Sequence, residues 1–540
     1  MQQLSAQDAQ FLYLETAHNL THVTAVSIYD PSTVPGGRTV RFKDILAHVE
    51  ERLRFNPLFT QRLLRLPLEL DYPYWVEDEY FDLEYHVTHG RLPAPGDWRQ
   101  FCIHLARYHS RPLDMNRPPW EMYVVEGLDH VPGLPAGSYA IATKVHHAAG
   151  DGTSLTRFFA SLADADPEGT PAVPLEEPPA QPSGAPSVLE LARRAVGNNL
   201  RSPLRLAGGV LRAAPGLLRS AEESVLRRGA AADKDRVAVP PTRFNVPVSP
   251  HKAFGACFAP LEQLRAVREQ VPGATVNDVV LAICAGALRR YLEHHGELPR
   301  EPLVAWVPVN ARARDGDDGA SSGNSITAMT TRIFTDEKDP VKRLRRIHRA
   351  TVRSKAARSG VSARIMTDLT QHVPAATQVL ASRLLLTSGV AARFCNLFIS
   401  NVPGPQVPLY MNGARAVHSL GLAPLADGMG LFIATPSYNG EIGFNVISTR
   451  EILPDMDVFM RCIEDSLAEY RDLPAPGRRK APARKRTAKA RAKAGAKTKT
   501  PAKKKAGERK TSPARKAAAR KRRPASGKAA PRRKAGRASS

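Results

Sequence analysis

Two adjacent histidines, followed by an aspartate and a glycine, are the residues of this sequence best suited to chemistry. His146 and His147 are separated by three small residues from Asp151-Gly152. An alternating, β-favouring run over 139–145 leads into the histidines, and a helix-like stretch over 153–159 follows the glycine. A strand that delivers an imidazole to a turn of small residues places a general base at the mouth of a cleft. The neighbouring carboxylate would orient a histidine or fix the loop by pairing with an arginine.

Two other interpretations of the histidine pair have less support. A zinc site is disfavoured because adjacent residues of a strand point to opposite faces, and no second motif with metal-ligand spacing completes a set. We therefore predict no metal site. A purely structural histidine is the usual explanation of a lone His, but the full pattern between strand and helix favours a functional one.

Further short motifs accompany the histidine segment in a fixed order. They lie over residues 4–16, 111–121, 138–152, 274–280, 307–312, 323–324, 400–405 and 431–440. In this order they resemble the bacterial wax ester synthase/acyl-CoA:diacylglycerol acyltransferase family, from about residue 4 to about residue 470. The histidine motif is shared with the wider group of acyltransferases similar to chloramphenicol acetyltransferase.

The resemblance implies a fold, a reaction and a catalytic residue. The fold would be α/β with mixed sheets, in two chloramphenicol-acetyltransferase-like domains with the active site in a channel between them. The reaction would be the esterification of diacylglycerol or long-chain alcohols by fatty acyl-CoA. It implies His147 as the base, His146 as support of the loop, and Asp151 as a loop-fixing residue with Arg312 as a candidate partner. Gly150 and Gly152 would permit the turn and leave room for substrate.

A second set of residues has either a substrate-binding or a structural interpretation. Asn277 and Asp278 begin a predicted helix, where a polar pair is usually a cap, and the resemblance offers a role in shaping the channel. Asn401 and Gly404 would donate amides towards the substrate or form a tight turn. Trp120 ends a segment in which family members usually read Pro-Leu-Trp, whereas this chain has Pro119 before the tryptophan. A second proline stiffens that turn and removes a backbone donor.

Length and periodicity predict the arrangement of the body. A chain of 540 residues is too long for one ordinary core. We expect an N-terminal domain over 1–165, a proline-rich linker and crossover region over 166–236, a C-terminal domain over 237–474 and a tail over 475–540. The patterns predict helices over 8–15, 42–55, 98–109 and 276–292, the last capped by Thr275. They predict strands over 23–29, 123–126, 139–145, 303–309, 326–333, 397–400, 431–435 and 442–446.

The positive charge of the chain is confined to its end. Residues 475–540 carry 27 Lys and Arg and one acidic residue, a net charge of +26, whereas residues 1–474 have a net charge of −1. The tail has no aliphatic residue larger than alanine, so we expect it to be disordered. A polycation of this kind would bind anionic lipid or nucleic acid. Residues 187–229, with eight arginines, three glutamates and leucines at near-helical intervals, fit a membrane surface or a crossover helix almost equally well.

Localisation and partners follow from the same features. The sequence has no layout typical of a signal peptide and no apolar run of membrane-spanning length. Its five scattered cysteines suggest reduced thiols. We therefore expect a cytoplasmic protein peripherally associated with the inner face of the plasma membrane or with lipid bodies. The expected small-molecule partners are fatty acyl-CoA as substrate, with no cofactor besides it, and diacylglycerol or a long-chain alcohol.

Two rival functions stay open at the level of sequence. A condensation-type acyltransferase would use the same histidine but take its acyl group from a carrier protein. A polyanion-binding tether of lipid bodies or of the nucleoid would act through the tail alone. Donor preference distinguishes the first rival, and removal of the tail distinguishes the second.

Overall fold

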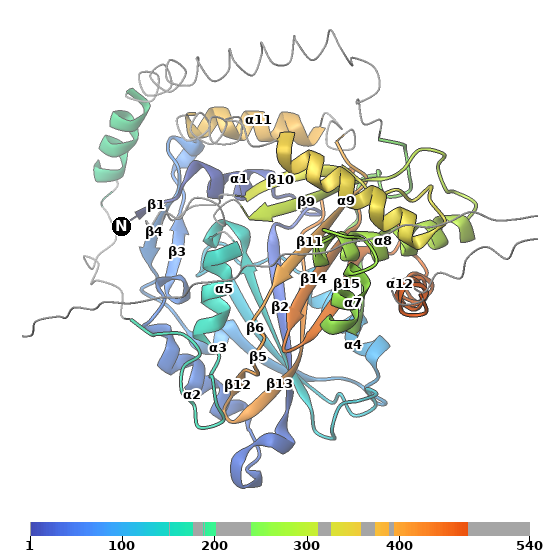
Figure 1. Cartoon of the computed structure of the whole chain (residues 1–540). Helices are drawn as coiled ribbons and strands as arrows, with labels where there is room; N and C mark the ends of the chain where they lie inside the picture. Colours follow the sequence, from blue (N-terminus) through green and yellow to red (C-terminus); the bar gives the residue numbers. More distant parts are fainter. Residues whose placement is uncertain are drawn as a thin grey trace, which may run out of the picture. The chain divides into compact units, whose positions relative to one another are not determined.

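The computed structural model describes residues 2–150, 152–176, 187, 189–200, 239–310, 326–357, 373–387 and 394–473 (Figure 1). The predicted basic tail and most of the arginine-rich region lie outside these ranges. Within the arginine-rich region the described part is a helix over 189–200. All described residues belong to one compact unit.

The first large sheet holds the strand that ends at the histidine pair. Its strand order is β12-β13-β2-β7-β6-β5. Adjacent strands are antiparallel, except that β5 and β6 are parallel. The strands are β2 (His22–Asp30), β5 (Val87–Arg91), β6 (Trp120–Glu126), β7 (Tyr139–His146), β12 (Tyr410–Met411) and β13 (Ala414–Leu422).

The alternation of side chains along β7 gives this sheet two buried faces. Tyr139, Ile141 and Val145 pack with helices α2 (Phe42–Leu53) and α5 (Gly152–Ser161) on one face. Ala140 and Ala142 join the main core on the other face, where α4 (Trp98–His109) lies. Successive side chains of a strand point to opposite faces, so a strand buried on both faces can be apolar at nearly every position. His146 ends β7 on the same side as the two alanines.

The second large sheet belongs to the C-terminal half. Its order is β10-β9-β11-β14-β15-β8, with parallel pairing of β9 to β11 and of β11 to β14. The strands are β8 (Lys252–Pro260), β9 (Val304–Asn310), β10 (Ile326–Arg332), β11 (Leu397–Pro403), β14 (Phe432–Tyr438) and β15 (Glu441–Thr449). Its helices are α7 (Leu261–Arg268), α8 (Val276–His294), α9 (Pro340–Ala357) and α12 (Met456–Arg471).

The two halves are joined by a strand exchange. Strand β13 lies far along the chain, yet it pairs with β2 of the N-terminal half over most of its length, from Arg415 opposite Asp30 to Leu422 opposite Thr24. The first large sheet therefore contains strands from both halves of the chain (Figure 1).

A small third sheet supports the N-terminal helix. It has the order β1-β4-β3, with β1 (Gln2–Gln3), β3 (Gln61–Leu64) and β4 (Tyr74–Glu77). Helix α1 (Ala6–Leu14) lies beside α11 (Ala375–Thr387), and both lie at the top of Figure 1. The remaining short helices are α3 (Leu83–His86) and the 3-10 turns η1 (Pro31–Thr33), η2 (Pro35–Gly37), η3 (Pro57–Phe59), η4 (Pro67–Glu69) and η5 (His147–Ala149).

Most predicted elements agree with the structure. The predicted helix over 98–109 has the bounds of α4, and the helix over 276–292 is α8, with Thr275 as its N-cap. All eight predicted strands are found, most of them longer by one to three residues at an end, and β10 is one residue shorter than predicted. The short strands β1, β3, β4, β5 and β12, together with β8, β13, α3, α7, α9, α11 and α12, were not predicted. A strand of two to five residues is too short to show a period.

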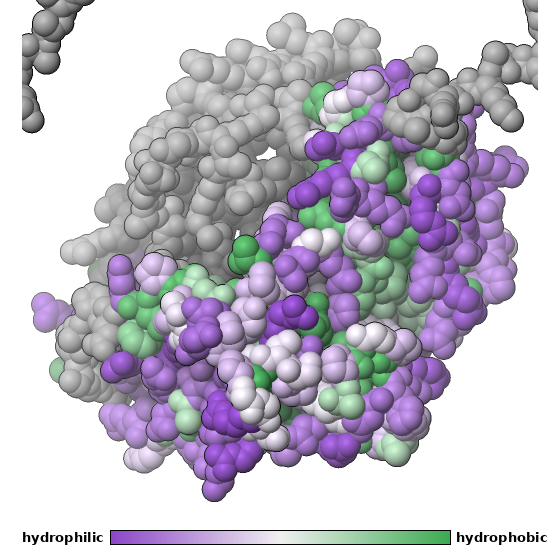
Figure 2. All heavy atoms as spheres, turned by 60° about the horizontal axis from the view of Figure 1, so that its bottom comes forward, coloured by the Kyte–Doolittle hydropathy of each residue, from purple (hydrophilic) through white to green (hydrophobic). Residues whose placement is uncertain are grey.

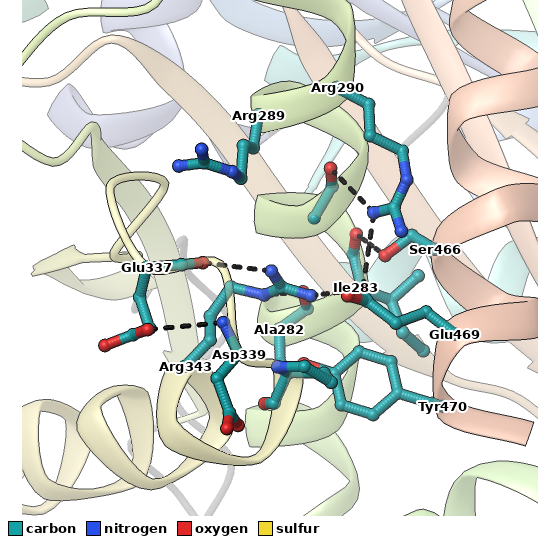
Figure 3. A network of polar contacts seen from close by, with 12 residues as sticks. Ala282, Ile283, Arg289, Arg290, Glu337, Asp339, Arg343, Ser466, Glu469 and Tyr470 are labelled. Carbon is teal, nitrogen blue, oxygen red and sulfur yellow. Dashed lines mark hydrogen bonds and ion pairs between the residues drawn. The ribbon is translucent and has the colours of Figure 1, made fainter. Parts of the chain in front are cut away.

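A buried arginine ties three helices of the C-terminal half together (Figure 3). The guanidinium of Arg343, on α9, is fully buried and lies 2.6 Å from the carboxylate of Glu469 on α12. It also donates to the carbonyls of Glu337 at 3.1 Å and Ala282 at 3.2 Å, the latter on α8. The small residue Gly286 is required beside it, because a Cβ there would lie 2.8 Å from the Arg343 guanidinium.

Replacing Arg343 by methionine is expected to lower the free energy of unfolding by about 3–5 kcal/mol, because it removes a buried ion-pair partner and leaves the carbonyls of Ala282 and Glu337 without this donor. Arg290→Met is the matched control, since Arg290 contacts the same Glu469 at 3.3 Å but is partly exposed. Its expected cost is below about 1 kcal/mol. Urea denaturation of the three proteins measures the difference. Equal stabilities of the two variants would contradict this account of the network.

Candidate active site

The histidine pair lies where strand β7 ends and the chain turns. His146 is the last residue of β7 and pairs with His22 of β2. His147 begins the turn η5, and helix α5 follows from Gly152. The predicted strand, turn and helix around the motif are thus present in this order. The sheet carries the two imidazoles to the end that faces α1.

His147 is half-buried and held from two sides. Its backbone amide donates to the carbonyl of Thr21 at 2.9 Å. Its ring stacks on Phe11 of α1, with the ring centroids 4.1 Å apart and the planes 12° from parallel. The Nδ1 atom is buried, so Nε2 is the ring nitrogen through which His147 would meet a substrate. The stacking fixes the plane of the imidazole before any substrate binds.

His146 is fully buried, and its hydrogen bonds define its protonation. The Nδ1 atom accepts a hydrogen bond from the amide of Ala148 at 3.0 Å. The Nε2 atom lies 3.0 Å from the carboxylate of Glu15 and 3.0 Å from the hydroxyl of Thr21. Because Nδ1 accepts, the proton resides on Nε2 and is donated to these oxygens. This tautomer binds the turn to α1 through Glu15, the residue that ends the helix.

Three residues of this arrangement were missed by the sequence reasoning. Glu15 and Phe11 lie in the motif over 4–16, and Thr21 follows it. The hydroxyl of Thr21 donates to the carbonyl of Phe11 at 2.9 Å, so the three residues form one support for the two histidines. The position of the 4–16 motif at the start of the chain was the available signal. Its contact with the histidines depends on tertiary structure.

A group of buried basic side chains lies beneath the turn, between β2, β7 and α4. His22 donates from Nε2 to the carbonyl of His109 at 2.7 Å, and Nδ1 of His109 lies 2.8 Å from the hydroxyl of Thr24. The ammonium of Lys144 is buried and lies 2.9 Å from the carboxylate of Glu121. Burial, assisted by the charge of Lys144, lowers the pKa of His109 to about 3 and places the pKa of His22 well below its usual value. Both histidines are therefore neutral in the folded protein near pH 7.

This group predicts a loss of stability in acid. The unfolded chain takes up a proton at each histidine below about pH 6.5, whereas the folded chain does not until far lower pH. Stability therefore falls as the pH drops below about 6.5, by about 1.4 kcal/mol per pH unit for each histidine. When the pH is lowered from 7.5 to 5, we expect the free energy of unfolding to fall by about 2 kcal/mol less in His109→Gln than in the wild type. Urea denaturation at the two pH values measures this difference. An equal loss in both proteins would contradict the assignment.

Of the other residues predicted to form the loop, only Gly150 and Gly152 lie within the described ranges. Asp151 and Arg312 lie outside the described residues, so their predicted pairing stays a prediction. Gly152 is the first residue of α5.

Asp278 is a helix cap, which is the structural one of its two predicted roles. It is buried, and its carboxylate accepts from the amide of Thr275 at 2.8 Å, which completes a capping box. It also lies 2.7 Å from the hydroxyl of Thr351 and 3.0 Å from Nδ1 of His348 on α9. The carboxylate thus caps α8 and binds it to α9. Asn277, beside it, is half-buried.

Trp120 and Gly404 also have structural surroundings. Trp120 is buried in the core that β7 forms with α2 and α5, donates to the carbonyl of Phe59 at 3.0 Å and stacks on His86. The amide of Gly404 donates to the carbonyl of Ser437 at 3.0 Å, and a Cβ at this position would lie 2.3 Å from that oxygen. The glycine therefore serves the close approach of two chain segments, and its amide is not directed at a substrate. Asn401 lies half-buried in β11, opposite Thr435.

A cavity and a cluster of potential metal ligands lie away from the histidine pair. A cavity of about 390 Å³ is lined by residues that include Arg52, Asp164 and Asn412. Its lining residue Val34 lies shortly after the end of β2. At 3.3 Å per residue, that end of the strand is about 25 Å from His22, which pairs with His146. Among the described residues, His294, His295 and Asp455 could hold a metal ion. Neither group includes His146 or His147.

Comparison with known proteins shows the family to which this chain belongs. Residues 4–280 match the wax ester synthase/diacylglycerol acyltransferase catalytic domain, and residues 322–471 match the C-terminal domain of the same family. The chain belongs to the wax ester synthase/diacylglycerol acyltransferase family. The expected fold and reaction class are thereby confirmed, and the protein is an acyltransferase.

Individual relatives cover most of the chain. A Mycobacterium tuberculosis protein named as a diacylglycerol O-acyltransferase is 34% identical over 458 residues, which are 84% of this chain and 87% of the relative. A Mycobacterium bovis protein with the same activity in its name is 31% identical over 470 residues, 86% of this chain and 97% of the relative.

Solved structures agree on the fold. The wax ester synthase/diacylglycerol acyltransferase from Marinobacter aquaeolei VT8 is 29% identical and superimposes with a TM-score of 0.60 over 87% of this chain and 98% of that chain. A trichothecene 15-O-acetyltransferase from Fusarium sporotrichioides superimposes with a TM-score of 0.53 over 87% of this chain and 94% of that chain. At 12% identity the second likeness concerns the fold alone.

Two features of this family member complete the description. Pro119, where family members usually have leucine, lacks an amide, but its carbonyl accepts from the amide of His146 at 2.9 Å. The unusual proline is thus part of the backbone that holds β7. In the described part of the chain, no helix has both the length and the apolar character needed to cross a membrane.

Proposed function

We propose that this acyltransferase transfers a fatty acyl group from acyl-CoA to the hydroxyl of diacylglycerol, and also to long-chain alcohols, with His147 as the general base. The observation that carries the proposal is the placement of His147. Its imidazole is fixed against Phe11 at the end of β7, and its Nδ1 is buried. The names of the relatives support diacylglycerol and wax-forming alcohols as acceptors.

The proposed reaction needs one proton carrier. Neutral His147 accepts the proton of the acceptor hydroxyl at Nε2 while the oxygen attacks the thioester carbonyl. The tetrahedral intermediate then collapses, the carbon–sulfur bond breaks, and the imidazolium returns the proton to the departing thiolate. The products are an ester and free CoA. Because one histidine serves both proton transfers, the reaction requires neither a covalent acyl-enzyme nor a cofactor besides the acyl donor.

His146 acts as a positioning residue in this proposal. Its hydrogen bonds to Ala148 on one side and to Glu15 and Thr21 on the other hold the turn that presents His147. Asp151 would fix the following part of the loop by pairing with Arg312, and Asn277 would shape the channel. Water must be excluded from the site, because hydrolysis of the thioester competes with ester formation.

The partners of the chain follow from its substrates and charge. Diacylglycerol and long-chain alcohols reside in membranes and lipid bodies, so we place the working enzyme at such surfaces. The tail over 475–540, with a net charge of +26, would strengthen attachment to anionic lipid. Binding of nucleic acid by the same tail is the competing use of this charge.

Product analysis tests the proposal against the use of a carrier protein. The purified full chain is incubated with palmitoyl-CoA, or with palmitoyl attached to an acyl carrier protein, together with dioleoylglycerol or hexadecanol. We expect triacylglycerol and wax ester from the CoA donor. Ester formed only from the carrier-bound donor would overturn acyl-CoA dependence, and no ester from either donor would overturn the proposed function.

A further inference from the structure

Three neighbouring elements of this protein expose large aliphatic side chains on the side of the fold that carries α1. They are α11, the turn η4 with the residue after it, and the helix over 189–200. Their exposed residues, named here the leucine surface, are Leu68, Leu70, Leu189, Val196, Leu200, Leu380 and Leu384.

Hydrogen bonds between these elements show that they lie side by side. The hydroxyl of Tyr72, just after η4, donates to the side chain of Gln378 on α11 at 2.5 Å. On the other side, the side-chain amide of Asn199 donates to the carbonyl of Leu70 at 2.5 Å. Figure 1 shows α11 and the helix over 189–200 at the same upper side of the molecule. The three elements that carry the leucine surface are therefore neighbours.

Helix α11 exposes an apolar stripe that a helix in water usually buries, although Ala375 and Val379 on its other side pack in the core beside α1. It buries the polar side chains of Gln378 and Ser382 and exposes Leu380 and Leu384, whose exposed fractions are 70% and 67%. Residues four apart lie on one face of a helix, so the two leucines form a single apolar stripe. A soluble helix normally turns such a stripe towards the core. Covering the two leucines with another apolar phase would be favourable.

The helix over 189–200 has apolar residues on two sides. Leu191 and Ala195 pack on Leu66 and Tyr74 in a small core. Leu189, Val196 and Leu200 recur at intervals of seven and four residues and are exposed. A helix that is apolar on both sides is expected to be covered on both.

Leu68 adds a third, independent observation. Its side chain is 88% exposed, and its backbone φ of 58° lies in the left-handed region. A branched apolar residue is rarely found there, and the conformation is unfavourable by about 1–3 kcal/mol. Here that conformation holds a leucine out towards the solvent.

Other faces of the protein differ. Figure 2 brings forward the lower side of Figure 1, where the coloured surface is mainly hydrophilic with hydrophobic residues interspersed. Val407, at 61% exposure, lies three residues before β12, which Figure 1 shows in the lower part of the molecule.

We propose that the leucine surface docks on a lipid layer and brings the side of the enzyme that carries α1 against it. The charge of the adjoining sequence favours lipid, because residues 187–229 contain eight arginines and three glutamates and would complement anionic headgroups. The composition agrees, since the surface is aliphatic, whereas protein interfaces are typically centred on tryptophan, tyrosine and arginine. The choice of lipid also rests on the proposed function, whose acceptors dissolve in lipid. Phe11 of α1 stacks on His147, and α1 lies beside α11, so docking here would occur one helix away from the proposed base.

The test uses the full chain with phosphatidylcholine–phosphatidylglycerol vesicles and compares wild type with the double variant Leu380→Glu/Leu384→Glu. Sedimentation is measured at about 0.5 M salt, where screening suppresses the attraction of the basic tail. We expect wild type to stay bound and the double variant to bind at least about tenfold more weakly, because two aliphatic side chains no longer enter the lipid. Val407→Glu is the matched control and should bind like wild type.

Several outcomes would overturn the docking surface. They are equal binding by the double variant and wild type, an equal loss in the control variant, and complete release of wild type by salt. A wild-type dimer that the double substitution dissociates would assign the surface to a second copy instead. Transfer rates on detergent-dispersed substrates are measured in parallel and should be equal in all variants. Vesicle binding without any transfer by wild type would overturn the proposed function and support the docking surface.

Discussion

Replacing His147 by alanine is expected to lower kcat for acyl transfer by about a hundredfold to ten-thousandfold. A general base that accepts the acceptor proton in the transition state contributes an effect of this size. The KM for acyl-CoA should change little, because the proposal gives His147 no role in binding the donor. Steady-state kinetics with palmitoyl-CoA and dioleoylglycerol measure both constants. The variant should fold, because the hydrogen bond from residue 147 to Thr21 uses the backbone amide.

His18→Ala is the matched control for this substitution. His18 is an exposed histidine in the loop after α1, and its side chain lies outside the proposed machinery. Its variant should retain the wild-type rate. A His147→Ala protein with more than about a tenth of the wild-type kcat would contradict the role of base.

Replacing Glu15 by alanine is expected to lower kcat by about tenfold to a hundredfold. The carboxylate accepts a hydrogen bond from Nε2 of His146, whose other nitrogen accepts from the turn that presents His147. Without Glu15, Nε2 of His146 retains only the hydroxyl of Thr21 as an acceptor, so the turn is held less firmly. A small displacement of a catalytic group costs up to about a hundredfold in rate. The effect should be smaller than that of His147→Ala, because the base itself remains.

The conservative variant separates positioning from general destabilisation. Glu15→Gln keeps an acceptor oxygen and should recover kcat to within about threefold of wild type. Glu69→Ala is the control, since Glu69 contacts α1 through the hydroxyl of Tyr13 at 3.4 Å. It should leave kcat unchanged. If Glu15→Ala and Glu15→Gln lose activity equally, or if the loss follows the melting temperature alone, the positioning role is wrong.

Sequence reasoning succeeded where local chemistry decides the structure. The strand of alternating residues before His146, the capping box of Thr275 and Asp278, and the helix α4 depend on interactions between residues close in the chain. These features fix the type and nearly the bounds of each element. The motif of the histidine pair was sufficient to locate the candidate site.

Sequence reasoning failed where distant segments meet. The bond between Glu15 and His146 joins residues 131 positions apart, and no periodicity marks either partner. The pairing of β13 with β2 is of the same kind, since a strand pattern does not specify which neighbour it joins. The buried surroundings of Trp120 and the bonded amide of Gly404 also depend on the folded neighbours of these residues.

The central claim is that His147 promotes direct transfer from acyl-CoA to a hydroxyl. Release of free CoA thiol from palmitoyl-CoA, with and without dioleoylglycerol, tests it most directly when wild type and His147→Ala are compared. We predict release by wild type that depends on the acceptor and is nearly abolished in the variant. Release that is independent of the acceptor, or equal in the two proteins, would contradict it.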